Sequence, residues 1–354
     1  MPMAGLREQI IRAGFETLYF SGAHKLLRHF VGGVGAILTL HHVRPARTEE
    51  FQPNGILEIT PEFLEHLIVA LQTADIDLVS LDEAFRRLAA GDFRRRFAAI
   101  TLDDGYRDNK EFAYPIFKAN DVPFAIYIPT SFMDRDGELW WLVLEEVIAR
   151  NNSVSLRMNG EDRVLGCATT EQKYTAFSAI YWWLRSLPTE NEIRATVRAF
   201  AARYNVDTKS FCDKLCMSWS ELAELARDPL MTVGAHTINH FILAKTDADV
   251  ARREIANGRA PIEKNIGIKP VHFSYPFGDP TSAGPREFAI ASELGFKTAV
   301  TTRPGVLFPE HRDYLMALPR ISINGDYQRL RYVDVLMSGA ATAVWNGFRR
   351  INAA

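Results

Sequence analysis

The stretch 99–109 constrains the fold more than any other part of the chain. It begins as an apolar, β-prone run and ends in two adjacent carboxylates, Asp103 and Asp104, followed by Gly105. Side chains in a strand alternate between its faces, so both acids converge on one centre only if the strand ends there. Two anions at the end of a buried strand are costly unless a cation or donors hold them. The sequence therefore predicts a metal site.

A hairpin turn at Asp104 and Gly105 is the alternative for this stretch. The residues that follow argue against it, because 109–120 carries apolar side chains at helical spacing and 123–128 has the composition of a buried strand. A strand, a helix and a second strand form a β-α-β unit. Parallel α/β folds place their active sites at the carboxyl ends of such strands.

The same alternation predicts one α/β unit for most of the chain. We expect strands at 36–43, 76–81, 99–102, 123–128, 231–235, 271–278, 298–301 and 318–321, and helices at 60–71, 82–90, 109–120, 219–227, 247–265 and 286–294. From 137 to 217 the alternation stops, and helices at 139–148, 170–187 and 191–204 predict a mostly helical insertion. In the insertion, core packing is the preferred role of Trp140-Trp141 and Trp182-Trp183, over a lid that stacks on sugar rings.

The two ends of the chain are predicted to be helical. Residues 1–30 contain an amphipathic pattern, for which packing on the main domain is preferred over association with a membrane surface. The predicted division is an N-terminal segment 1–30, a main α/β domain 31–325 that contains the insertion, and a C-terminal tail 326–354.

Composition restricts partners and compartment. The 354 residues have a net charge of -2, which gives no general attraction to nucleic acid or to anionic membranes. Cys167, Cys212 and Cys216 lack the pairing of a tetrahedral zinc site, so we interpret them as reduced thiols. The N-terminus lacks a signal-peptide pattern and no apolar run reaches the ~18 residues of a membrane span. We therefore expect a cytoplasmic protein.

Two histidines follow the predicted strand 231–235. A lone His-x-x-x-His motif is weak evidence, but His236 and His240 lie at the carboxyl end of one strand, as the acids do on another. Two imidazoles and one carboxylate form a ligand set for catalytic zinc. They also match the facial triad of non-haem iron oxygenases. The second acid favours hydrolysis, because a water on the metal needs a base.

Three ordered motifs resemble those of a known family. Thr101-Leu102-Asp103-Asp104-Gly105, His236-Thr237-Ile238-Asn239-His240 and Ser274-Tyr275-Pro276-Phe277-Gly278 resemble the polysaccharide deacetylases with a NodB homology domain, carbohydrate esterase family 4. The resemblance covers 36–322 outside the insertion. It implies a distorted (β/α) barrel of seven or eight strands. It also implies metal-dependent removal of acetyl groups from N-acetylglucosamine-type sugars, such as a chitooligosaccharide or an exopolysaccharide precursor.

The resemblance assigns a role to each motif residue. By it, Asp103 is the general base, and the metal ligands are Asp104, His236 and His240. The backbone N–H of Phe277 is the oxyanion donor. Zinc is the expected ion, with cobalt, nickel or manganese as alternatives. The partner is an N-acetylated glycan, and we also consider peripheral contact with membrane-bound polysaccharide-synthesis machinery.

The chain also departs from the family pattern. Ser274 replaces the arginine that orients the base in many members, and Leu318-Pro319-Arg320 replaces a late Leu-x-His that supplies the general acid. His41 resembles the early histidine of the poly-N-acetylglucosamine deacetylase branch, and we prefer it as the acid over His42, which faces the opposite way in a continuous strand. Arg320 is a candidate substitute for the missing arginine.

Three further interpretations stay open. Tyr106, Arg107 and Asp108 either line a substrate groove or belong to a solvated loop. A deacetylase-like amidase acting on a non-sugar amide is the nearest alternative function. A non-catalytic protein that binds glycan or assists polysaccharide assembly is the alternative from another class, motivated by the missing arginine and histidine.

Overall fold

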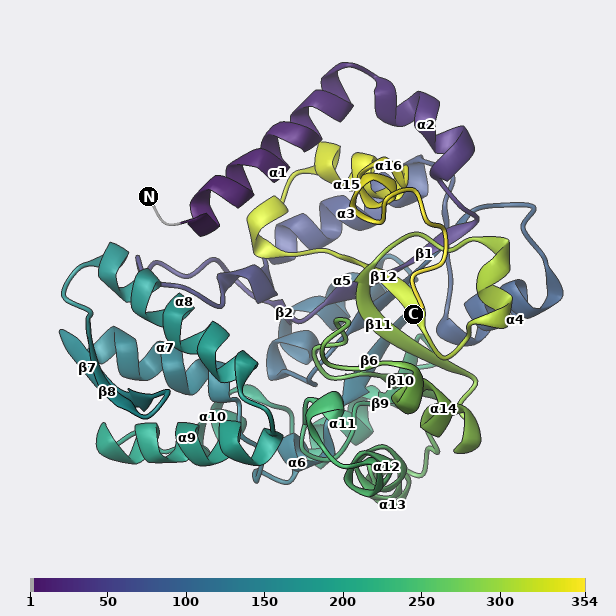
Figure 1. Ribbon diagram of the computed structural model, residues 1–354. Helices are drawn as coiled ribbons and strands as arrows, with labels where there is room; N and C mark the ends of the chain where they lie inside the picture. The colour runs from purple at the N-terminus through teal and green to yellow at the C-terminus, as the bar shows by residue number, and fades with distance from the viewer. Residues whose placement is uncertain (1–2, 354) are drawn as a thin grey trace.

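Seven parallel strands close into a barrel in the computed structural model, which describes residues 3–353 (Figure 1). The strands of the ring, in order, are β1 (Gly35–Leu40), β5 (Phe97–Leu102), β6 (Phe124–Ile128), β9 (Met231–Ala235), β10 (His272–Ser274), β11 (Thr298–Pro304) and β12 (Leu318–Ser322). The ring closes because β1 pairs with both β5 and β12. An eighth strand, β4 (Asp77–Leu78), pairs with the start of β5. The predicted barrel of seven or eight strands is thus confirmed.

Helices cover the outside of the ring. They are α3 (Pro61–Thr73), α4 (Leu81–Ala90), α5 (Tyr114–Ala119), α11 (Trp219–Leu225), α12 (Ala248–Asn257), α13 (Ala260–Ile266) and α14 (Pro285–Glu293). The short α6 (Thr130–Met133) instead follows β6 and contacts the histidine loop, where the N–H of Ser131 donates to the carbonyl oxygen of Ile238. The inside is filled by apolar side chains from several strands, among them Ile37, Ala99 and Val300. Strands β1 and β5 are buried along their whole length, as expected for strands with a core on both faces.

Two predicted elements differ from those observed. The strand 36–43 is interrupted at His41, after which β2 (His42–Val43) pairs with β3 (Glu58–Ile59). The single helix predicted at 247–265 is two helices that separate near Gly258. A Cβ at Gly258 would lie 2.8 Å from the carbonyl carbon of Thr237. This glycine therefore allows the helix pair to approach the loop that carries His236 and His240.

The insertion contains the three predicted helices and a hairpin. Its elements are α7 (Trp140–Arg150), β7 (Ser153–Met158), β8 (Glu161–Gly166), α8 (Thr170–Ser186), α9 (Glu190–Arg203) and α10 (Ser210–Leu215). The antiparallel pair β7–β8 was not predicted. Its turn is Asn159-Gly160, with φ of 52° and 84°. Asn-Gly is a strong hairpin signal, so the sequence did contain the information.

The two chain ends pack together on one side of the barrel (Figure 1). They form α1 (Met3–Phe20), α2 (Ala23–Val31), α15 (Leu330–Met337) and α16 (Ala340–Trp345). Phe15 of α1 is buried and its ring stacks on Tyr332 at 5.0 Å between centroids. The boundaries proposed for the three segments stay a prediction.

Two general findings concern the described part of the chain. Its three cysteines are buried and free, as predicted for reduced thiols. No helix among the described residues has the length and apolar character needed to cross a membrane.

Candidate active site

Two consecutive carboxylates enter the site because the backbone changes direction at the end of β5. Asp104 adopts a φ of 74° and Gly105 a φ of 65°, both in the left-handed region. This conformation breaks the alternation of a strand, so Asp103 and Asp104 both lie at the carboxyl end of the barrel. Both side chains are buried, each with 2% of its surface exposed. The change of direction thus uses Asp104 as well as Gly105.

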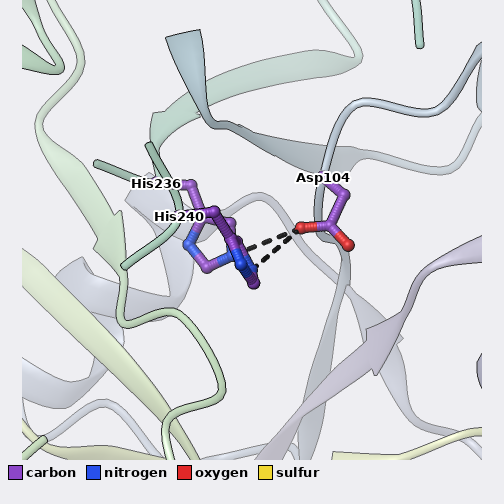
Figure 2. A group of neighbouring side chains, drawn as sticks. All are labelled: Asp104, His236 and His240. Carbon is purple, nitrogen blue, oxygen red and sulfur yellow. Dashed lines mark ion pairs between the residues drawn. The ribbon is translucent and has the colours of Figure 1, made fainter. Parts of the chain in front are cut away.

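Three predicted ligands form one cluster, shown in Figure 2. Nε2 of His240 lies 3.3 Å from Oδ1 of Asp104, and Nε2 of His236 lies 3.6 Å from the same oxygen. The three residues offer ligand atoms within 4.8 Å of one another. Atoms bound at ~2.0–2.1 Å to one tetrahedral ion lie roughly 3.3 Å apart. The spacing therefore fits a single small divalent cation.

The hydrogen bonds around the cluster support the same interpretation. Oδ1 of Asp104 is buried, and no described residue donates a hydrogen bond to it. His236 donates from Nδ1 to the carbonyl oxygen of Ser274 at 2.6 Å, which leaves Nε2 with a free lone pair. This is the arrangement in which a backbone acceptor orients a histidine ligand. A buried oxygen without a donor is costly in a folded protein, and a cation would satisfy it.

The protonation states of the cluster are set by burial. Burial lowers the pKa of His236, and burial together with the nearby imidazole of His236 lowers the pKa of His240 further. Both imidazoles are therefore neutral at pH 7, as metal ligands must be. Burial and the charge of Asp103 raise the pKa of Asp104 to about 8. A bound cation would favour the carboxylate form.

Arg320 of β12 holds the second acid. Its guanidinium donates two hydrogen bonds to Asp103, at 2.8 Å to Oδ1 and 2.7 Å to Oδ2. Burial acts to raise the pKa of Asp103, but the charge and hydrogen bonds of Arg320 outweigh it, so the pKa lies well below its usual range. Asp103 is thus ionised. This contact is the one expected if Arg320 takes the place of the arginine that orients the base in many family members.

His41 and His42 occupy different environments. Leu40 pairs with Leu102 in the β1–β5 register, so His41 and Asp103 follow at the same level. Burial lowers the pKa of His41 to about 4. The nearby charge of Asp103 acts to raise this pKa, and those of Arg320 and His236 act to lower it. His42 instead lies 2.6 Å from Asp108, from Nδ1 to Oδ2. Of the two candidates, His41 is therefore the one beside the predicted base.

The residues around His42 correct a further interpretation. Tyr106 is fully buried and its ring stacks on His42 at 3.6 Å between centroids. Asp108 is buried against His42, and Arg107 pairs with Glu221 at 3.1 Å. The alternative of a solvated loop is wrong at Tyr106 and Asp108, because both side chains are buried, whereas a role in a substrate groove stays a prediction. Both side chains contact His42, which directly follows the end of β1.

The Phe277 loop lies against the cluster. Phe277 has a φ of 60°, and no described residue accepts a hydrogen bond from its N–H. Its ring lies 5.1 Å from that of His240. The guanidinium of Arg185, in the insertion, lies 4.6 Å above the Phe277 ring and bonds to Asp279 in the same loop. The predicted oxyanion donor is therefore adjacent to the ligands.

The insertion contributes one wall of the site. Trp140 and Trp141 are buried, and both rings contact Phe277. The Trp141 ring also lies 5.2 Å from that of His240. This pair packs in a core, as expected, and that core lies directly behind the candidate site. Trp182 differs, because 62% of its surface is exposed.

Two residues that hold the histidine loop were not predicted from the sequence. Buried Arg194 of α9 donates to the carbonyl oxygens of Asn239 and His240, at 3.0 and 3.3 Å. Glu254 of α12 accepts from the backbone N–H of Asn239 at 2.8 Å. These contacts stabilise a loop in which His240 has a φ of 57°. A Glu190–Arg194 pair one helical turn apart is common on solvated helices, so no local signal marked it.

A parallel barrel with two imidazoles, one carboxylate and a second, arginine-bound carboxylate at its carboxyl end defines the class of protein: an α/β barrel with a candidate catalytic metal site. Comparison with protein families gives a more specific result. A family model described as polysaccharide deacetylase matches residues 174–299, which include the histidine motif and the Phe277 loop. The predicted resemblance to this family is confirmed over that region. A search of curated proteins finds no match.

Several solved structures share the fold. The Streptococcus pyogenes deacetylase PplD in complex with acetate is 18% identical, with a TM-score of 0.54 over 82% of this chain and 92% of that chain. IcaB from Ammonifex degensii is 16% identical, with a TM-score of 0.53 over 87% of this chain and 98% of that one. A de-N-acetylase from Aggregatibacter actinomycetemcomitans is 13% identical, with a TM-score of 0.53 over 85% and 99%. At these identities the likeness establishes a common fold.

Proposed function

We propose that the protein is a metal-dependent hydrolase that removes N-acetyl groups from an N-acetylglucosamine-type oligo- or polysaccharide. The observation that carries the proposal is the Asp104, His236 and His240 cluster beside an ionised Asp103. The family match and the deacetylases with the same fold support the reaction class. Metal dependence and the sugar are part of the proposal.

In this proposal Asp103 receives the proton of the attacking water. Arg320 keeps Asp103 ionised, but it also makes this carboxylate a weak base. Proton transfer to it therefore requires an acidified water. A divalent ion held by the three ligands, zinc in the first place and cobalt, nickel or manganese otherwise, would lower the pKa of water and polarise the acetyl carbonyl.

Two further groups complete the proposed reaction. The Phe277 N–H would donate to the oxyanion, an interaction typically worth about 3–4 kcal/mol. His41 would protonate the departing amine. Because its pKa is about 4, His41 is neutral at pH 7 and must first gain a proton. The negative charge that develops next to it in the reaction favours that gain.

The partners and the compartment are likewise proposals. The glycan is the substrate, and a peripheral contact with membrane-bound polysaccharide-synthesis machinery would bring the enzyme to it; IcaB and the BpsB deacetylase domain share the fold. The expected cytoplasmic location stays a prediction.

Acetate release from N-acetylglucosamine oligomers tests the function. Purified protein is stripped with a chelator and then supplied with zinc or cobalt, beside Asp104→Asn and, as a matched control, Asp249→Asn at an exposed position. We expect acetate release that follows the metal, is lost in Asp104→Asn and is kept in the control. Metal binding without acetate release would contradict the sugar substrate and favour another amide. Absence of metal binding would contradict the site itself.

A further inference from the structure

Exposed apolar side chains concentrate at the two ends of the chain. Among described residues, seven of the fourteen exposed large hydrophobics lie at positions 10–30 and 344–348: Ile10, Phe20, Leu26, Phe30, Val344, Trp345 and Phe348. These residues belong to α1, α2, and α16 with the turn that follows it. Figure 1 places these helices together on one side of the barrel. Large exposed apolar surfaces mark sites of interaction.

Helix α2 shows this most clearly. Leu26 and Phe30 lie one turn apart on the same face and are 68% and 67% exposed. Phe20, at the end of α1, is 76% exposed and lies just before the turn into α2. The opposite face of α2 carries buried His24. Helix α2 thus already packs on the protein with one face, and it presents a second apolar face outward.

The acids of this surface lie in α1, where Glu8 pairs with Arg12 and Glu16 with Arg331, and beyond them the charges are of one sign over long stretches. No Asp or Glu occurs from Thr17 to Thr48, or from Val335 to Ala354. Lys25, Arg28 and Arg349 are exposed, and none of them has an ion pair with a described residue. In a chain with a net charge of -2, this surface is locally cationic. It is therefore complementary to an anionic partner.

A hollow of about 630 Å³ lies beside α2. Its lining includes the cations Lys25, Arg28 and Arg96, together with apolar side chains of α3 and α15. Asp334 is an acid in the same lining. Guanidinium groups are suited to phosphate oxygens. Arg96 already donates to the carbonyl oxygens of Gly32 and Met337, so Lys25 and Arg28 are the cations of the hollow that a phosphate group would meet beside the exposed apolar face.

We propose that α1, α2 and α16 form a docking surface for an anionic phospholipid bilayer. The apolar side chains would enter the boundary between headgroups and acyl chains, while the cations contact the anionic headgroups. A second copy of the chain fits less well, because a two-fold interface through this surface would bring cations against cations. The inference does not depend on the proposed reaction, since none of these residues belongs to the barrel mouth.

Vesicle binding by the full chain tests the proposal. The protein is mixed with vesicles of phosphatidylcholine alone, or of phosphatidylcholine with phosphatidylglycerol, and separated by flotation at low and high salt. We expect binding to the anionic vesicles that weakens with salt. A Lys or Arg near an anionic surface contributes enough for about a fivefold change in affinity. Lys25→Gln with Arg28→Gln should therefore weaken binding by about 25-fold.

A second variant and a matched control keep the outcome interpretable. Leu26→Asn with Phe30→Asn should also lose binding, whereas Val164→Asn, at a position 73% exposed in the insertion, should keep it. Far-ultraviolet circular dichroism checks that all variants fold. Equal binding to both vesicle types, no binding by the folded wild type, or equal loss in Val164→Asn would overturn the proposal. So would a dimer that the Leu26 and Phe30 changes dissociate while vesicle binding is unaffected.

Discussion

Removal of Arg320 should destabilise the protein through a single buried ion pair. None of the Arg320 side chain and 3% of the Asp103 side chain are exposed, and the two groups share two short hydrogen bonds. Removing one partner of a buried pair leaves the other charge without compensation, at a cost of about 3–5 kcal/mol. Arg320→Met, which keeps an unbranched apolar stem, should therefore lower the free energy of unfolding by that amount at neutral pH.

The pH dependence gives this prediction a second, independent part. In the wild type the pKa of Asp103 lies below its usual value, so the pair stabilises the fold at neutral pH and this contribution is lost as the pH falls below about 4. In Arg320→Met burial remains while the cation is gone, so the pKa of Asp103 should rise above that of the unfolded chain. The variant should thus recover part of its lost stability on acidification.

Urea unfolding followed by circular dichroism measures both effects. The wild type, Arg320→Met, Asp103→Leu and the double variant form a thermodynamic cycle. The double variant should be more stable than the sum of the single changes predicts, because it leaves no unpaired buried charge. Strictly additive effects, or a cost below about 1 kcal/mol for Arg320→Met, would refute the reasoning.

Four shorter predictions follow. Asp104→Asn removes the carboxylate of the ligand set, so zinc stoichiometry by atomic emission should fall while the melting temperature changes little. His41→Ala should slow acetate release by about 10²–10⁴-fold and keep zinc; full activity would contradict its acid role. Arg185→Ala should lower kcat more than it raises KM, since its guanidinium lies 4.6 Å above the Phe277 ring, and a change in KM alone would indicate substrate binding instead. Hydrogen bonds from α15 lower the pKa of Glu16 from 4.5 to about 2, so its stabilisation is present above pH 4.5 and lost as the pH falls towards 2; Glu16→Gln should lower the melting temperature at neutral pH, and a difference from wild type that persists near pH 2 would contradict this.

The sequence by itself determined the alternation of strands and helices and the candidate ligands, and the resemblance of its three motifs to a known family implied the barrel. Strand and helix periods are local properties, and the motif residues directly follow strands whose carboxyl ends meet in a parallel barrel. The sequence alone therefore places Asp104, His236 and His240 at one edge of the fold, where the structure brings them together. The roles proposed for these residues stay predictions until metal and substrate are tested.

Only the tertiary structure decided which side chains support these residues. Arg320 reaches Asp103 across 217 residues of chain, because closing the ring brings β12 beside β1, and β1 pairs with β5 on its other side. Arg194 holds the histidine loop from a helix of the insertion. Neither contact has a local signature, since it depends on strand register and on how distant helices pack. The periodicity of the sequence determines which residues lie at the ends of strands, whereas closure of the barrel determines which distant side chains contact them.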